Sequence, residues 1–321
     1  MLSHMNYKDI DPSILPYIHE VITTFPGKVY ERSPKESREL FSEHAKTLPL
    51  IRNNKLIVSD HELITPEGKI TIRIYRPTIE RKRPAALVYM HGGGWIMGDL
   101  NSHDQVCVDL CLRCRLTVIA LDYGLSPENR FPVALNQCYS SYLELLHNKM
   151  WLGSASKNIM IGGDSAGGNL AAALSMKLRL EGKPLPKAQI LFYPCLSLNF
   201  ESPSYIKFAN APILDKKSMK WFWSVYLEEK FQTNDPLAVP LLEKNLSGLP
   251  KTIICTAEID PLASEGIRFK NNLVKCSTIA EHINAKAMVH GFIRFRDKSP
   301  VADKYFWLVC KKINEFLKVS D

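Results

Sequence analysis

The sequence lacks any long apolar run and any dense cysteine framework. Its uninterrupted apolar segments are short, as in residues 85–90, whereas a membrane-spanning helix needs about 20 apolar residues. No basic start followed by an apolar stretch, the mark of a secretory signal, opens the chain. The eight cysteines are scattered through apolar segments of a 321-residue chain, which is typical of reduced, buried thiols. We therefore expect a cytoplasmic protein without stable membrane insertion.

A strong charge of either sign is absent as well. Lysine and arginine number 41 and aspartate and glutamate 33, a net charge of +8. The basic residues are spread out, with short clusters such as residues 81–83, so the patch expected of a nucleic-acid-binding protein is missing. Neither of the glycine-rich patterns that cradle nucleotide phosphates, G-x-G-x-x-G and G-x-x-x-x-G-K-[ST], occurs. We expect no nucleic-acid partner and no cofactor.

The segment 102–114 has two interpretations, a metal site and a core-facing helix. His103, Cys107 and Cys111 recur every four residues, so they share one stripe of the expected helix, and imidazole and thiolate are zinc ligands. Structural zinc sites usually combine two short ligand pairs, and this segment instead carries valines and leucines throughout. We interpret it as a core-facing helix and predict no metal.

What the sequence does contain is a regular alternation of strands and helices. A hairpin is expected around residues 56–58 and 70–75, which flank the turn at Pro66 and Gly68. Short apolar strands then alternate with amphipathic helices, which predicts a mostly parallel, doubly wound α/β sheet with both faces covered. The expected strands are 85–90, 117–121, 158–161, 188–193, 252–256 and 279–285, and the expected helices are 102–114, 133–146, 169–180, 263–275 and 303–317.

Two stretches do not follow this alternation. Residues 1–50 read as short helices punctuated by prolines, and residues 197–249 are rich in aromatic residues. Within the second stretch, apolar residues recur at helical spacing from Met219 to Leu227. Such an apolar face is consistent with packing in the core or with lining an acyl or alcohol pocket. It is also consistent with contact to a membrane or to a second copy of the chain, so a homodimer is one of the hypotheses.

A nucleophile motif lies at one strand-to-helix junction. Residues 163–167 read Gly-Asp-Ser-Ala-Gly, a G-x-S-x-G pattern, directly after the strand 158–161 and before a helix. A serine on so tight a turn needs very small neighbours two residues away, and Gly163 and Gly167 meet this need. We predict Ser165 to be a catalytic nucleophile.

A serine hydroxyl needs a base and an acid that orients the base, and in this architecture they follow in the order acid, then histidine. Asp260 comes after the strand 252–256, and Glu258 is the competing acid. His290 follows the last strand and is the best placed of the nine histidines. We predict a triad of Ser165, Asp260 and His290.

The oxyanion of such a reaction needs backbone N–H donors. Glycines 92–94 follow the strand 85–90, and consecutive glycines allow a substrate oxygen to approach the backbone closely. Ala166, the residue after the nucleophile, supplies a further N–H. We predict an oxyanion hole of Gly92, Gly93 and Ala166.

These motifs together resemble the hormone-sensitive-lipase-like esterases of the α/β-hydrolase fold. The resemblance rests on five segments in order, from about residue 50 to the end: His91–Trp95, Asp122–Pro132, Gly163–Asn169, Asp260–Leu262 and His290–Phe292. It implies a carboxylic ester hydrolase acting on a small-molecule ester with the residues named above. It also implies a discontinuous helical cap, residues 1–50 and 197–249, over a core of residues 51–196 and 250–321.

The resemblance is incomplete in one segment. The family usually has Arg where this chain has Gly124 and Ala where it has Ser126, which puts a supporting network under the site in doubt. Asp164 is expected to support the site by hydrogen bonding. The predicted function is hydrolysis of short to medium acyl esters through an acyl-enzyme. The alternatives are an amide or formamide hydrolase, an acyltransferase, or a non-catalytic ligand-binding protein on this fold.

Overall fold

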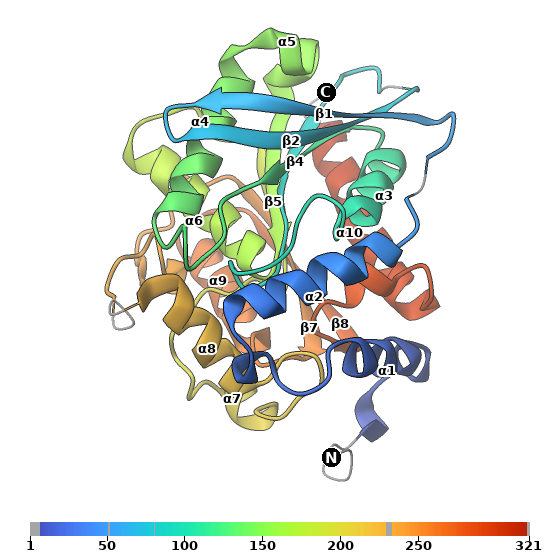
Figure 1. The fold of residues 1–321 in the computed structure, drawn as a ribbon. Helices are drawn as coiled ribbons and strands as arrows, with labels where there is room; N and C mark the ends of the chain where they lie inside the picture. Colours follow the sequence, from blue (N-terminus) through green and yellow to red (C-terminus); the bar gives the residue numbers. More distant parts are fainter. Residues whose placement is uncertain (1–6, 51, 80, 229–232, 320–321) are drawn as a thin grey trace.

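One eight-stranded sheet organises the chain (Figure 1). The computed structural model describes residues 7–50, 52–79, 81–228 and 233–319. The strand order is β1-β2-β4-β3-β5-β6-β7-β8. The pairs β1–β2 and β2–β4 are antiparallel and the other neighbours are parallel, which confirms the predicted fold class. The strands are β1 (Leu56–Thr65), β2 (Gly68–Pro77), β3 (Ala86–Met90), β4 (Thr117–Asp122), β5 (Ile159–Asp164), β6 (Ala188–Phe192), β7 (Lys251–Ile259) and β8 (Ala280–Val289).

Helices cover both faces of the sheet, so its central strands are buried throughout and mostly apolar. Every residue of β3, β5 and β6 is buried. One apolar core lies under α4 (Val133–His147), α6 (Ala166–Leu180) and α9 (Ala263–Lys275). A second core lies under α3 (Asp104–Cys114) and α10 (Pro300–Val319). A functional site is therefore expected among the loops at the carboxyl ends of the parallel strands.

Several element boundaries differ from the sequence prediction, and two of them lie next to the candidate site. Helix α6 begins at Ala166, three residues earlier than expected. The helix can begin there because Gly167 has no side chain. Its backbone lies very close to that of Met90, and a Cβ at Gly167 would clash with the Met90 carbonyl. Strand β8 runs on to Val289, because its pairing with β7 resumes after an irregularity between Ala257 and Ile259.

The two stretches outside the alternation add no strand to the sheet in their described parts. They contain α1 (Leu15–Thr24), α2 (Pro34–Thr47), α7 (Pro203–Lys207) and α8 (Lys216–Leu227), together with short 3-10 turns. These helices gather in the lower part of Figure 1, away from β1 and β2. Helix α2 begins where Ser33 and Glu36 cap each other, and α8 begins where the Asp215 carboxylate accepts from the backbone of Ser218. The predicted apolar face of α8 is buried.

The cysteine stripe of α3 lies in the second core. Cys107 and Cys111 are buried, and burial raises the pKa of Cys111 to about 12, so this thiol stays protonated. His103 contacts the carboxylate of Asp164 instead, at 3.4 Å. Within the described residues, no group of three His, Cys, Asp or Glu side chains is arranged to hold a metal ion. The described helices also include none that is both long and apolar enough to cross a membrane.

Candidate active site

Ser165 lies at the turn between β5 and α6. Its backbone has φ 55° and ψ −118°, a strained conformation for a residue with a side chain. The turn is so tight that a Cβ at Gly163 would lie 2.3 Å from the carbonyl oxygen of Met90, and one at Gly167 would lie 2.0 Å from it. The two glycines therefore allow the turn that holds the serine hydroxyl above the end of the sheet.

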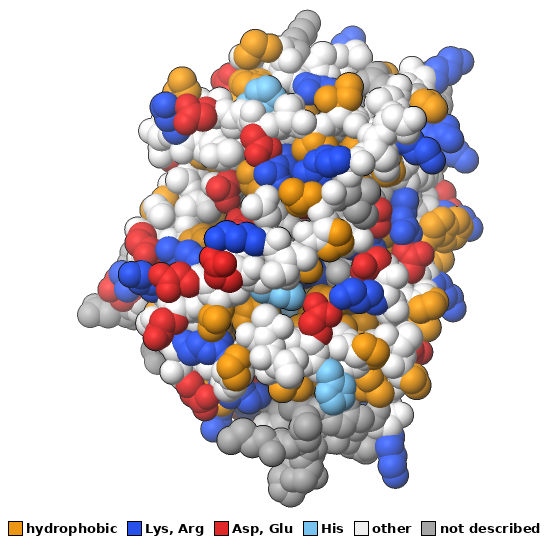
Figure 2. All heavy atoms as spheres, turned by 45° about the vertical axis from the view of Figure 1, so that its right-hand side comes forward, with side chains coloured by type: hydrophobic (Ala, Val, Ile, Leu, Met, Phe, Trp, Pro, Cys, Tyr) orange, Lys and Arg blue, Asp and Glu red, His pale blue; other side chains and the backbone are white. Residues whose placement is uncertain are grey.

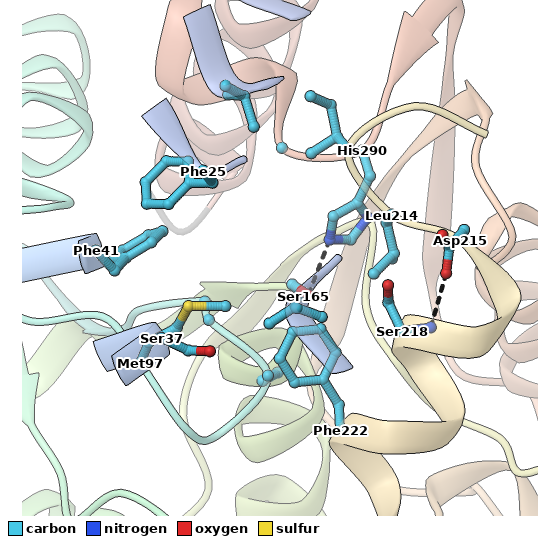
Figure 3. A pocket seen from close by; sticks show the side chains of 18 of the residues that line it. Phe25, Ser37, Phe41, Met97, Ser165, Leu214, Asp215, Ser218, Phe222 and His290 are labelled. Carbon is cyan, nitrogen blue, oxygen red and sulfur yellow. Dashed lines mark hydrogen bonds between the residues drawn. The ribbon is translucent and has the colours of Figure 1, made fainter. Parts of the chain in front are cut away.

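His290 and Asp260 complete a continuous hydrogen-bonded chain with this serine. The Ser165 Oγ lies 2.9 Å from His290 Nε2 (Figure 3). On the other side of the ring, His290 Nδ1 lies 2.7 Å from Asp260 Oδ2. Asp260 follows β7 and is fully buried, and its Oδ1 accepts a hydrogen bond from the backbone of Leu262 at 2.9 Å. His290 follows β8. The loops of three parallel strands therefore bring the three predicted residues together.

Glu258, the competing acid, faces elsewhere. Its carboxylate accepts hydrogen bonds from Lys286 Nζ and from the backbone N–H of Ala287, both at 2.8 Å. Both oxygens are engaged by residues near the end of β8, and neither forms a hydrogen bond with His290. Asp260 is the carboxylate that the structure offers to the histidine.

The glycine loop after β3 requires one correction. The Gly92 N–H donates a hydrogen bond to Asp164 Oδ1 at 3.0 Å, so it is not free to bind a substrate oxygen. By contrast, the Gly93, Gly94 and Ala166 N–H groups donate to no protein acceptor within the described part of the chain. Gly94 therefore replaces Gly92 in the candidate oxyanion hole, beside Gly93 and Ala166.

Asp164 supports this loop from below. Besides the Gly92 N–H, it accepts a hydrogen bond from the Tyr89 hydroxyl at 2.7 Å, and His103 Nε2 lies 3.4 Å away. Burial by itself would raise the pKa of Asp164, but the neighbouring His103 and the hydrogen bonds outweigh burial and hold this pKa at about 2. An ionised carboxylate thus fixes the start of the glycine loop, in agreement with the expected supporting role.

The segment that departs from the family pattern is held by a different arginine. A Cβ at Gly124 would lie 2.7 Å from the side chain of Asn129, so a larger residue there would have to displace that side chain. Arg38 of α2 donates instead to the carbonyl oxygens of Ser126 at 3.0 Å and Ile96 at 3.1 Å, and pairs with Glu128 at 2.7 Å. A guanidinium from the N-terminal helices therefore anchors this segment.

A cavity of about 360 Å³ opens above Ser165 and His290. It is lined by site loops and by residues of α1, α2 and α8, and Figure 3 shows Phe25, Phe41, Met97 and Phe222 around it. Helix α8 also packs against the glycine loop. Phe222 covers Gly94, and the rings of Tyr226 and Trp95 stack with centroids 4.2 Å apart.

Comparison with known proteins identifies the family of the chain. Residues 87–294 match the model of a family described as having the alpha/beta hydrolase fold. The chain belongs to the α/β-hydrolase family. Esterase LipI of Mycobacterium tuberculosis is 31% identical over 92% of this α/β hydrolase and 93% of its own length. Carboxylesterase NlhH of the same organism is 31% identical over 91% of this chain and 92% of its own. The resemblance inferred from the motifs is thereby confirmed.

A solved structure gives the same fold. The thermostable esterase from Pseudomonas putida ECU1011 superimposes on this α/β hydrolase with a TM-score of 0.89, covering 96% of this chain and 98% of its own, at 24% identity. At that identity the likeness concerns the fold.

Sequence reasoning missed the inward face of α2. Ser37, Phe41 and His44 are spaced by four and three residues, so they share one helix face, and all three line the cavity. Arg294, four residues after His290, lines it too. The spacing on α2 was visible in the sequence, but the pairing of that face with Arg294 depends on tertiary packing.

Proposed function

We propose that this protein is a carboxylic ester hydrolase that works through an acyl-enzyme, with Ser165 as nucleophile, His290 as general base and Asp260 as the group that orients the imidazole. The observation that carries the proposal is the unbroken hydrogen-bonded chain from Ser165 through His290 to Asp260 on the floor of a cavity. The esterase names of relatives such as LipI and NlhH support the same reaction.

The reaction has two halves. The Ser165 Oγ attacks the ester carbonyl while His290 Nε2 accepts its proton, and Asp260 stabilises the imidazolium that forms. His290 then protonates the leaving alcohol, and the acyl group remains on Ser165. In the second half His290 accepts a proton from the water that attacks the acyl-enzyme, and it returns this proton to Ser165 Oγ as the acid is released.

The negative charge on the carbonyl oxygen is held by the Gly93, Gly94 and Ala166 N–H groups. Their hydrogen atoms are free of protein acceptors among the described residues, so they are available without rearrangement. Donors fixed in advance in this way are worth about 10²- to 10³-fold in kcat for each donor lost.

Residues 1–50 and 197–249 act in this proposal as a cap over the core of residues 51–196 and 250–321. Helices α1, α2 and α8 supply the apolar walls of the cavity, which suits short to medium acyl chains. All eight cysteines are free thiols and seven are buried, which supports the expected cytoplasmic location. Cell fractionation tests the location, and sedimentation tests the homodimer.

The function is tested with p-nitrophenyl butyrate and the matched p-nitroanilide amide. Wild-type protein should hydrolyse the ester far faster than the amide, and Ser165→Ala should lose roughly 10⁴-fold or more of kcat while its circular dichroism stays unchanged. Faster amide cleavage, or transfer to an added alcohol in preference to water, would favour the amidase or acyltransferase alternatives. Binding without turnover would favour a ligand-binding protein.

A further inference from the structure

One side of the cavity carries polar groups that have no partner in the described protein. Ser37 is 2% exposed, and its Oγ makes no hydrogen bond with any described residue. Figure 3 shows this hydroxyl pointing from α2 into the cavity, on the side opposite His290. His44, two turns along the same helix face, lines the cavity as well, but its Nε2 lies 3.7 Å from Glu20 Oε1 and is not without a partner. Buried polar atoms without partners are rare in folded proteins, and a ligand is one source of the missing partner.

Arg294 adds a positive charge to the same place. It lies in the 3-10 turn Phe292–Phe295 that follows His290, and its guanidinium carbon is 4.7 Å from the centroid of the Phe41 ring. Its buried Nε has no hydrogen-bond partner, and no described carboxylate lies within 4.0 Å of the guanidinium. Phe41 holds the guanidinium by a cation–π contact but does not neutralise it.

Neighbouring cations differ from Arg294 in this respect. Lys28, which also lines the cavity, is paired with Asp215 at 2.7 Å. Lys298 is paired with Glu20 at 2.9 Å. The pKa of His44 is lowered, first by burial and second by the positive charge of Arg294. The two side chains therefore interact electrostatically. Arg294 is half-buried at the cavity wall without a carboxylate partner among the described residues, so an anionic group that enters the cavity can pair with it.

We propose that the preferred substrates of this esterase carry a free carboxylate, which Arg294 binds together with the Ser37 hydroxyl. The inference rests on the proposed ester hydrolysis and adds the chemical class of the substrate. A guanidinium offers parallel N–H donors that match the two oxygens of a carboxylate. The apolar side chains of Val21, Phe25 and Met97 also line the cavity, so a short hydrocarbon spacer joins the carboxylate to the ester.

The test compares esters that differ only in a terminal methyl or carboxylate. On the acyl side the pair is methyl valerate and monomethyl glutarate, and on the alcohol side it is butyl acetate and 4-acetoxybutanoate. Acid release is followed by pH-stat titration, and the ratio of kcat/KM for the carboxylate ester to that for its neutral match is compared between proteins. In at least one pair, the wild-type ratio should exceed one, and that pair shows on which side of the ester the carboxylate lies.

Arg294→Met should lower that ratio by about 10- to 100-fold, mainly through KM, because it removes charge-assisted hydrogen bonds to bound substrate. Arg294→Lys should recover part of the ratio, and Ser37→Ala should lower it several-fold. Lys298→Met is the matched control, since it removes a nearby charge that is already paired and does not line the cavity. It should leave both esters unaffected.

The neutral esters distinguish failure of the carboxylate subsite from failure of the proposed function. If the wild type hydrolyses the neutral esters at least as well as both carboxylate esters, and Arg294→Lys and Ser37→Ala leave the ratios unchanged, the carboxylate subsite is refuted. If the wild type hydrolyses none of the four esters any better than Ser165→Ala does, the proposed function itself fails.

Discussion

Asp260 illustrates at the scale of one residue how the fold fixes the chemistry. Its two oxygens have separate partners, His290 Nδ1 at 2.7 Å and the Leu262 N–H at 2.9 Å, so the carboxylate cannot rotate without losing both. It is fully buried, and the hydrogen bond to Nδ1 leaves Nε2 of the ring facing Ser165. The carboxylate thereby fixes which ring nitrogen meets the nucleophile.

We predict that Asp260→Asn lowers kcat by roughly 10³- to 10⁴-fold, because an amide cannot stabilise the imidazolium or hold the ring in the required tautomer. Glu258→Gln is the matched control, since that carboxylate contacts Lys286 and Ala287 and not the histidine. Steady-state hydrolysis of p-nitrophenyl butyrate measures both. Equal losses in the two variants would contradict the assignment of Asp260.

Asp164 gives a prediction for the pH dependence of stability. Its pKa is about 2 in the folded protein and near 3.8 when unperturbed, so ionisation favours the folded state. The shift is worth about 2 kcal/mol of unfolding free energy, present above about pH 4 and lost as the pH falls towards 2. Urea unfolding of wild type and Asp164→Asn should show a stability gap of this order at pH 7 that narrows below pH 4. A gap that does not change with pH would argue against this ionised carboxylate.

At the scale of elements, the contact between α8 and the glycine loop links the helical segments to the chemistry. Phe222 lies directly over Gly94, where a Cβ would come within 2.1 Å of the Phe222 ring. Tyr226, one turn further along α8, stacks on Trp95 at the end of the same loop. A change in α8 is therefore transmitted to the N–H groups that we assign to the oxyanion.

Gly94→Ala should lower kcat by roughly 10²-fold, because the clash with Phe222 displaces the oxyanion donors. The double variant Gly94→Ala with Phe222→Ala should recover part of this loss, since the space is restored. Gly248→Ala is the control for backbone strain alone: its φ is +71°, close to the +61° of Gly94, but nothing lies within 4 Å of the added carbon. Hydrolysis kinetics of the three proteins show what causes the loss of kcat. If the double variant is as impaired as Gly94→Ala, the clash with Phe222 is not the cause.

The elements of the sheet were predictable because their signals are local. Each expected strand between residues 85 and 256 is a short apolar run, and each of β3 to β7 was found at its expected place. The misassignment of Gly92 has the opposite cause. Its N–H donates to Asp164 at the end of β5, a contact between two residues that are 72 positions apart in the sequence. The anchoring of the segment around Ser126 by Arg38 likewise depends on how α2 packs.

At the scale of the whole molecule, the net charge of +8 is distributed over the surface. Figure 2 shows lysine and arginine interspersed with aspartate and glutamate on the visible face. The motif order of the triad was readable from the sequence because it follows the strand order of the sheet. The charge that bears on chemistry in our account is instead a single unpaired guanidinium inside the cavity, which no composition could reveal.

The size of the cavity predicts the acyl-chain preference. For p-nitrophenyl esters from acetyl to palmitoyl, kcat/KM should rise with each added CH₂, worth about 0.8 kcal/mol, until the cavity of about 360 Å³ is filled. It should then fall, with palmitoyl well below the best chain. Phe25→Ala enlarges one wall and should move the optimum to longer chains. A palmitoyl optimum in the wild type would contradict these walls.

The acyl-enzyme is tested most directly by covalent labelling with a fluorophosphonate, read by intact-protein mass and peptide mapping. We predict one adduct per chain, located on Ser165, and none on Ser165→Ala, whose circular dichroism should match that of the wild type. Labelling of a different residue, or full labelling of folded Ser165→Ala, would contradict the assignment of the nucleophile and with it the mechanism.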